Sequence, residues 1–256
     1  MDRKAVYYHG CVVDYFDLDT GRAVVEILER VGCTVEVPEL ICCSFPLLNS
    51  GDFQAARKRA TELIRVLAEY VESGHQVVYS CPTCGHALKE AYPKLLGKSA
   101  RDVADNTHFI SSYLLDLVGN ARAELKFDDR PRHMAYHTPC HLRTQDLSTA
   151  SVELLNLVPK LDVVHVDKGC CGMGGTWALR SKRRGELGAE AGSALFEDIH
   201  DRQPQIVATD CFGCGIQIAR NTQVIPLHPM QILLDSLIEA PQRGEIQYRT
   251  RQRRSC

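Results

Sequence analysis

The sequence predicts an α/β protein with two tandem homologous domains, each built on a parallel sheet. Two observations support this fold class. Short β-prone runs alternate with segments of helical periodicity along the chain, which is the pattern of a parallel sheet covered by helices. Ten of the twelve cysteines also form one five-point pattern that occurs twice, with corresponding cysteines 128 to 130 residues apart. We expect a first cysteine-rich domain over residues 1–125, a second over 126–240 and a basic tail over 241–256.

The elements alternate in the same order in both halves. In the first half, β-prone runs and helical stripes predict strands and helices in turn over residues 5–8, 23–31, 34–37, 53–71, 76–79 and 87–95. The second half repeats this order, starting with a strand, over residues 133–136, 152–158, 162–166, 187–199 and 206–209. A polar segment over residues 118–132 is expected to link the halves.

Each group of cysteines follows a predicted strand. The first set is Cys11, Cys42, Cys43, Cys81 and Cys84, and the second is Cys140, Cys170, Cys171, Cys211 and Cys214. Ligands of open α/β sheets bind outside the carboxyl ends of the strands. Three strand ends in each half can therefore bring five sulfur atoms to one place, and we expect a metal site at the carboxyl ends of the strands of each domain.

The composition is that of an ordinary globular protein, with 45% hydrophobic and 24% charged residues. A formal net charge of −2 gives no reason to expect nucleic-acid binding. No apolar run approaches the ~18 residues that span a bilayer, and the start of the chain lacks the apolar core of a signal peptide. We therefore expect a cytoplasmic protein that reaches a membrane only through partner subunits. Clustered cysteines in that compartment indicate metal binding rather than disulfides.

Three kinds of chemistry fit cysteines in this pattern. Structural zinc takes four ligands, commonly from two Cys-x-x-Cys pairs, whereas each half offers one such pair, an adjacent Cys-Cys and an isolated Cys. A redox dithiol fits Cys81-Pro-Thr-Cys84 alone, but it does not explain why Cys211 and Cys214 recur in register with further cysteines. Iron–sulfur clusters suit the number and type of ligands best. The pattern identifies no catalytic residue, and without a Gly-x-Gly-x-x-Gly motif it gives no support for flavin or nicotinamide binding.

Some residues near the cysteines allow two interpretations. The Gly172–Gly175 segment could donate N–H groups to cluster sulfurs or form a flexible turn. Trp177 is expected in the core rather than over a cluster. Cys33 is expected to be a buried small hydrophobic residue, and Cys256 is given no role.

Two pairs of histidines are placed by the repeat. His9 and His137 precede Cys11 and Cys140, and His108 and His228 are also expected to match across the halves. Histidine can ligate iron or carry protons, but helix capping or ordinary packing is the expected role. His141, next to Cys140, has no counterpart in the first half, where valine stands.

The repeated motif resembles the cysteine-rich CCG domain, which is defined by Cys, Cys-Cys-Gly and Cys-x-x-Cys at these spacings. The second half resembles it fully through Cys170-Cys171-Gly172, whereas the first half has Ser44 in place of the glycine. Tyr8-His-Gly-Cys11 and Tyr136-His-Thr-Pro-Cys-His141 are most similar to the C-terminal part of the cysteine-rich subunit of anaerobic glycerol-3-phosphate dehydrogenase. The cysteine-rich subunit of heterodisulfide reductase, and iron–sulfur subunits of glycolate, lactate and fumarate/succinate systems, carry the same pattern.

This resemblance implies an iron–sulfur subunit of an oxidoreductase. It implies two [4Fe-4S] clusters, noncubane as in heterodisulfide reductase, with the ten repeated cysteines as iron ligands. We expect electrons to pass between a ferredoxin-type or flavoprotein partner, each on a separate polypeptide, and a terminal acceptor such as a small disulfide or a quinone-linked carrier. Two alternatives stay open: a catalytic heterodisulfide reductase subunit, and a zinc-stabilised scaffold without redox chemistry.

Overall fold

The computed structural model describes residues 3–120 and 123–238 and has the predicted α/β fold. The first half contains a four-stranded parallel sheet in the order β2-β1-β3-β4, and the second contains a three-stranded parallel sheet in the order β6-β5-β7. In each sheet the first strand of the half is flanked on both sides, and every connection is a crossover. The expected basic tail and Cys256 lie outside the described residues.

The bounds of the elements follow the predicted alternation. The first half comprises β1 (Arg3–Tyr8), α1 (Gly10–Tyr15), α2 (Leu18–Arg30), β2 (Cys33–Glu36), α3 (Phe45–Asn49), α4 (Phe53–Glu72), β3 (Gln76–Tyr79), α5 (Pro82–His86), a π-helical turn (Ala87–Ala91), α6 (Tyr92–Leu96), α7 (Lys98–Asp105), β4 (Thr107–Phe109) and α8 (Ile110–Gly119). The second half comprises β5 (Arg132–His137), α9 (Cys140–Arg143), α10 (Ala150–Leu155), β6 (Leu161–Val166), a 3-10 turn (Trp177–Leu179), α11 (Lys182–Ala191), α12 (Ser193–Arg202), β7 (Ile206–Ala208), α13 (Phe212–Thr222) and α14 (Pro229–Ser236).

All the expected strands are present within about two residues at each end. The stripe expected over 187–199 is two helices, α11 and α12, which meet at Gly192. Strand β4 and the closing helices α8 and α14 were not predicted. A three-residue strand such as β4 is too short for its period to be read from the sequence.

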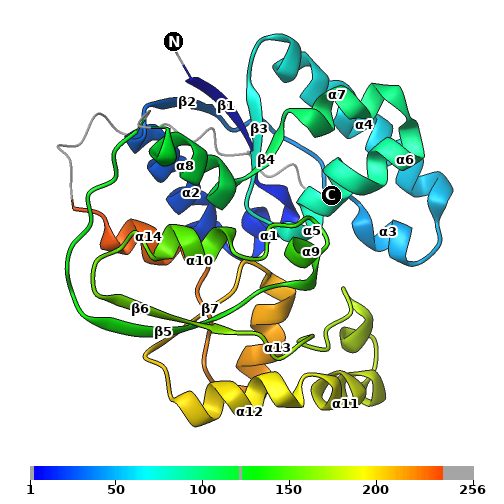
Figure 1. The fold of residues 1–256 in the computed structure, drawn as a ribbon. Coiled ribbons are helices and arrows are strands. Elements are labelled where there is room, and N and C mark those ends of the chain that lie inside the picture. Colours follow the sequence, from blue (N-terminus) through cyan, green and yellow to red (C-terminus); the bar gives the residue numbers. More distant parts are fainter. Residues whose placement is uncertain (1–2, 121–122, 239–256) are drawn as a thin grey trace.

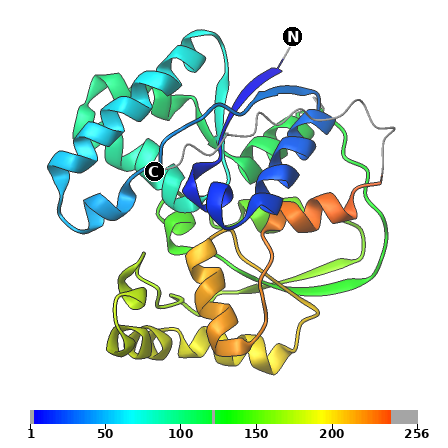
Figure 2. The ribbon, with the colours of Figure 1, turned by 180° about the vertical axis from the view of Figure 1, so that it is seen from behind.

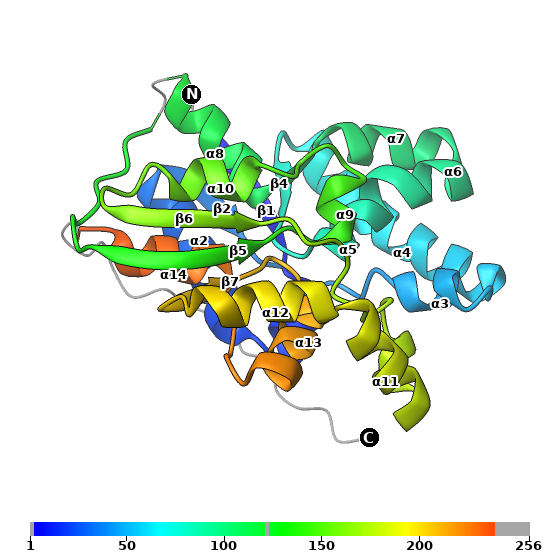
Figure 3. The same ribbon diagram turned by 60° about the horizontal axis from the view of Figure 1, so that its bottom comes forward.

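The two sheets enclose a shared core of helices. Alternate residues of a strand point to opposite faces. In β1, Ala5 and Tyr7 pack with α2 and α8, and in β5, Met134 and Tyr136 pack with α10 and α14, in one continuous hydrophobic cluster. The other faces carry separate clusters, with α4 and α7 over the first sheet and α12 and α13 over the second. The molecule is therefore layered as helices, sheet, helices, sheet and helices, with α12 and α13 on the outside of the second sheet (Figure 1, Figure 3).

The helices of the central layer pack against each other across the two halves. Helix α8 of the first half packs on α10 of the second, and α14 of the second packs on α2 of the first. By their order in each half, α2 corresponds to α10 and α8 to α14, so the two contacts are equivalent. The contact of α14 with α2 can be followed in the view from behind (Figure 2).

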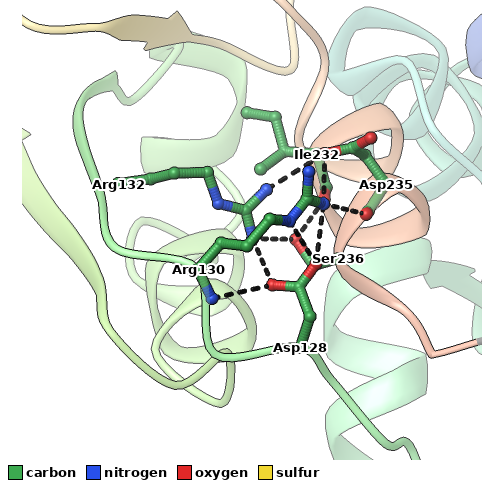
Figure 4. A network of polar contacts seen from close by, with 6 residues as sticks. All are labelled: Asp128, Arg130, Arg132, Ile232, Asp235 and Ser236. Carbon is green, nitrogen blue, oxygen red and sulfur yellow. Dashed lines mark hydrogen bonds and ion pairs between the residues drawn. The ribbon is translucent and has the colours of Figure 1, made fainter.

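A polar network ties α14 to the start of β5 (Figure 4). Arg130 and Arg132 both donate to Asp235 Oδ2, at 3.0 and 3.1 Å. Arg132 also donates to Ser236 Oγ at 2.7 Å and to Asp128 at 3.4 Å. Because Arg132 is only 12% exposed while Asp235 is 64% exposed, the network joins the edge of the core to the surface.

Candidate metal centre

The ten repeated cysteines lie after the carboxyl ends of the strands. Cys11 is in the first turn of α1, Cys42 and Cys43 are in the loop between β2 and α3, and Cys81 and Cys84 begin α5. In the second half, Cys140 begins α9, Cys170 and Cys171 lie in the loop after β6, and Cys211 and Cys214 begin α13. Each set therefore draws its sulfurs from three strand ends of one sheet.

The sulfur atoms of each set approach one another closely. Cys11 Sγ lies 3.5 Å from Cys42 Sγ, and Cys43 Sγ lies 3.5 Å from Cys84 Sγ. In the second half, Cys171 Sγ lies 3.2 Å from Cys214 Sγ. The three other cysteines of the second set, Cys140, Cys170 and Cys211, interact electrostatically or by hydrogen bonds with these two.

The turn after each adjacent cysteine pair has a left-handed backbone. Gly172 has φ of +79°, and Ser44, at the equivalent position, has φ of 55°. The N–H of Gly172 donates to Cys170 Sγ at 3.3 Å, and the N–H of Ser44 donates to Cys42 Sγ at 3.4 Å. The turn that directs an N–H group to a cysteine sulfur is therefore kept although the glycine is not, as one of the two interpretations of the Gly172–Gly175 segment expects.

Protons are distributed unevenly within the first set, because thiols at this distance do not ionise independently. Hydrogen bonds with the thiols of Cys11 and Cys43 lower the pKa of Cys42 to about 2. The hydrogen bond from Cys84, helped by backbone N–H groups, lowers the pKa of Cys81 to about 7 against the effect of burial. The same contacts to Cys43 and Cys81 raise the pKa of Cys84 well above its usual value.

The second set shows the same division. Hydrogen bonds with the thiols of Cys170 and Cys214 lower the pKa of Cys171, although its burial opposes this. The contact with Cys171 raises the pKa of both Cys170 and Cys214. In each half the hydrogen bonds among the thiols therefore favour ionisation of one sulfur, and a cation bound there would displace the remaining protons.

The two sets face the same interface between the halves. A cavity of about 180 Å³ is lined by both Cys81 and Cys211, the first cysteines of the two Cys-x-x-Cys pairs. Val12, Phe212 and Ile225 form part of its apolar wall; its polar lining includes Asp210, His228 and Thr209. The Oγ1 atom of Thr209 is buried without a hydrogen-bond partner.

A second contact joins the sets beside Phe45. The rings of His86 and His141 stack with centroids 4.9 Å apart and planes 5° from parallel. Thr83, inside the first Cys-x-x-Cys pair, bonds His141 Nδ1 at 2.9 Å. Burial lowers the pKa of both histidines, which favours their neutral form. His141 was singled out in the sequence, whereas His86 carried no signal.

The structure corrects two expected matches of histidines by one residue. Tyr136 pairs with Ala208 as Tyr7 pairs with Val78, and Ala208 and Val78 stand three residues before the equivalent cysteines Cys211 and Cys81. His137 therefore matches Tyr8, and His9 matches Thr138. Likewise His228 matches Phe109 at the start of the closing helix, where His228 caps α14 by accepting the N–H of Met230. Capping is thus confirmed for His228.

Two further expectations concern single residues. Cys33 is buried as predicted, with 5% exposure. Trp177 is not in the core, because it is 38% exposed and carries the guanidinium of Arg184 at 5.6 Å from its ring centroid. Trp177 follows a glycine-rich loop without helix or strand, so no regular element directs its ring toward the sheet. No helix among the described residues is long and apolar enough to cross a membrane.

Comparisons with known proteins agree with the doubled pattern. The cysteine-rich domain family CCG matches residues 5–89 and 134–219. A subunit of anaerobic glycerol-3-phosphate dehydrogenase from Escherichia coli strain K12 is 28% identical over 236 residues, which cover 91% of this chain but only 59% of that relative. Lactate utilization protein A from Macrococcus caseolyticus strain JCSC5402 is 31% identical over 246 residues, covering 90% of this chain and 96% of the relative.

Solved structures are less similar. Glutamate racemase from Francisella tularensis subsp. tularensis SCHU S4 aligns with 91% of this chain and 79% of its own, at 12% identity and a TM-score of 0.37. A likeness this loose supports no inference about this chain.

Proposed function

This chain belongs to the family of proteins with the cysteine-rich CCG domain, and we propose that it is the iron–sulfur subunit of a multi-subunit oxidoreductase. In this proposal, electrons pass between a ferredoxin-type or flavoprotein partner and a terminal acceptor. The observation that carries it is the doubled set of five thiols, each drawn from three strand ends, with sulfurs in close contact in both halves.

The residues present fit an iron–sulfur cluster. Such clusters are held by cysteine thiolates, and their potential depends on burial and on hydrogen bonds to sulfur. Each half offers a buried pair of thiols, Cys43 with Cys84 and Cys171 with Cys214, and an N–H group directed at a further sulfur. When bound, a cluster would supply one-electron transfer. The ten repeated cysteines would hold the iron, and the cores around them would keep water from the buried sulfurs.

The arrangement of the two sites supports a relay. Cys81 and Cys211 line one cavity, and the stack of His86 and His141 joins the segments next to Cys84 and Cys140. Two sites that share an interface can exchange electrons without a carrier between them. The relatives are named as part of a dehydrogenase and as a lactate utilization protein, which supports a role with partner proteins.

The first test is the iron and acid-labile sulfide content of anaerobically purified protein, with EPR spectra in the oxidised and reduced states. We expect about eight irons per chain, as two four-iron clusters require. Signals unlike those of cubane clusters would identify the noncubane type. Zinc without iron would contradict the proposal and favour the zinc-stabilised scaffold.

The cavity between the halves favours a second candidate, a catalytic disulfide reductase. A disulfide bound beside Cys81 and Cys211 would accept two electrons from the partner protein and two protons, so that its S–S bond breaks and two thiols form. His228 and Asp210 line the cavity and are titratable groups placed near such a substrate. Turnover of a small disulfide with a reduced dye as electron donor would support this candidate. An absence of turnover together with an unchanged cluster spectrum would leave the relay.

A further inference from the structure

The last residue of β1 and the last residue of β5 occupy equivalent positions but differ chemically. These residues are Tyr8 and His137, and each points to the outer face of its sheet, where the buried pair of thiols lies. Tyr8 donates its hydroxyl proton to the carbonyl oxygen of Ile41 at 2.9 Å. Its only polar atom is therefore satisfied by the backbone of its own half.

His137 is in a different situation. It is 2% exposed, its Nδ1 atom has no hydrogen-bond partner, and a side-chain hydrogen bond joins its ring to Cys171. A ligand nitrogen of its ring and the sulfurs of Cys171 and Cys214 all lie within 4.8 Å of one another. Such a group of three metal-ligating atoms is found only here among residues 3–120 and 123–238.

A buried polar atom without a partner costs about 1–3 kcal/mol, and the fold offers no backbone carbonyl to His137 as it does to Tyr8. A metal ion in contact with the two thiols would lie within reach of the ring nitrogen of His137 that faces them, and neutral imidazole is a common ligand of iron. Most hydrophobic residues would satisfy the packing at this place, as the ring of Tyr8 does in the first half. Packing alone therefore does not require the ring nitrogen of His137, whereas a bond to a metal ion would.

We propose that His137 is a nitrogen ligand of the iron at the second site, so that this site combines thiolates with one imidazole while the first site has thiolates alone. This inference rests on the proposed iron–sulfur function. A neutral ligand adds no negative charge, and histidine ligation raises the reduction potential of iron–sulfur centres relative to all-thiolate ones. The second site is then the more easily reduced of the two, and electrons entering at the first site would collect at the second.

The test uses pulsed EPR of the full chain, purified without oxygen, with and without ¹⁵N-labelled histidine. We expect a nitrogen hyperfine coupling of the size of directly bound imidazole, which changes with the isotope. This measurement needs no substitution, so it does not depend on the folding of a variant. The inference would be overturned if no nitrogen coupling were found. It would also be overturned by a coupling as weak as that of a nitrogen that only donates a hydrogen bond to a thiolate.

Matched variants assign the coupling to its residue. H137F and Y8F place the same side chain at the two equivalent positions. H137F should lose the nitrogen coupling and lower the midpoint potential of one cluster only, whereas Y8F should leave the coupling unchanged. A coupling that persists in H137F would come from another histidine and would overturn the inference.

Iron analysis distinguishes a failure of the His137 proposal from a failure of the proposed iron–sulfur function. Protein that contains iron in both sites but shows no histidine coupling would overturn the role of His137 and leave the proposed function standing. Protein that contains no iron would overturn both.

Discussion

The two halves of the molecule have the same strand order around their first strand and the same cysteine spacing, yet they differ beside the cysteines. The differences are Tyr8 against His137, Ser44 against Gly172, and Ser80 against Asp210, which precede or follow equivalent cysteines. None of them replaces a repeated cysteine. The comparison shows that both halves have the same cysteine pattern, whereas the residues next to the cysteines differ between the halves.

The halves also differ in the exposure of their sulfurs. All five cysteines of the first set are buried or half-buried, whereas Cys140 and Cys170 of the second set are exposed. In the first half, α3 follows the adjacent cysteines directly and its Phe45 packs over them. In the second half a glycine-rich loop follows them instead. The second site is therefore the one that an outside molecule reaches more easily.

The largest effect is expected from removing one buried thiol in each half. Cys43→Ser and Cys171→Ser should each lower iron and sulfide by about half, because each set holds its own cluster. Metal analysis and EPR of the two variants, beside the Cys33→Ser control outside the repeat, measure this. If either variant lost all iron, the sites would not be independent, and if Cys171→Ser lost none, the ligand assignment would be wrong.

The equivalent turn positions should respond unequally to substitution. In Gly172→Ala, the new Cβ would lie 1.8 Å from the carbonyl oxygen of Gly188 and the left-handed backbone would be strained, so we expect a loss of about 2–5 kcal/mol in the free energy of unfolding. Ser44→Gly should change it by less than about 1 kcal/mol. Denaturant unfolding measures both. Similar losses in the two variants would contradict the difference between the turns.

A smaller difference is expected at the two tyrosines that bond the residues preceding the Cys-x-x-Cys pairs. Tyr136 donates to the buried carboxyl of Asp210, whereas Tyr7 bonds Ser80 Oγ at 2.8 Å. Burial raises the pKa of Asp210, so this carboxylate depends on its donors. Tyr136→Phe should cost about 1.5–3 kcal/mol of unfolding free energy and Tyr7→Phe about 0.5–1.5 kcal/mol. Asp210 also accepts a hydrogen bond from Ser151 Oγ at 2.9 Å and lies 3.8 Å from His228 Nε2. Equal costs in denaturant unfolding would show that these two contacts suffice for Asp210.

The smallest effect is expected at the exposed end of the network in Figure 4. Asp235→Asn should lower the free energy of unfolding by about 0–1 kcal/mol, because Asp235 is 64% exposed and its ion pairs are screened by solvent. The loss should shrink further in high salt. A loss of several kcal/mol in denaturant unfolding would mean that Asp235 is needed to hold α14 against the second sheet.

Sequence periodicity located the strands that precede the cysteines, because β-branched runs such as Gln76–Tyr79 end directly before them. The match of His9 with His137 was wrong because it paired the two histidines by residue type. Strand pairing instead makes His137 equivalent to Tyr8. Only backbone pairing, as between Tyr136 and Ala208, fixes that register. The cavity beside Thr209 and the stack of His86 with His141 were not predictable, since both depend on how the halves pack.

The packing of helices across the two halves bears on how the two cysteine sites can differ. Contacts of α2 with α14 and of α10 with α8 are reciprocal, which is the contact pattern of a twofold-symmetric dimer. In such a dimer every substitution is made twice, so both copies stay identical. In one polypeptide the two halves keep this interface but are encoded separately, so a substitution at Tyr8 leaves His137 unchanged. Two sites related by symmetry can then take different roles.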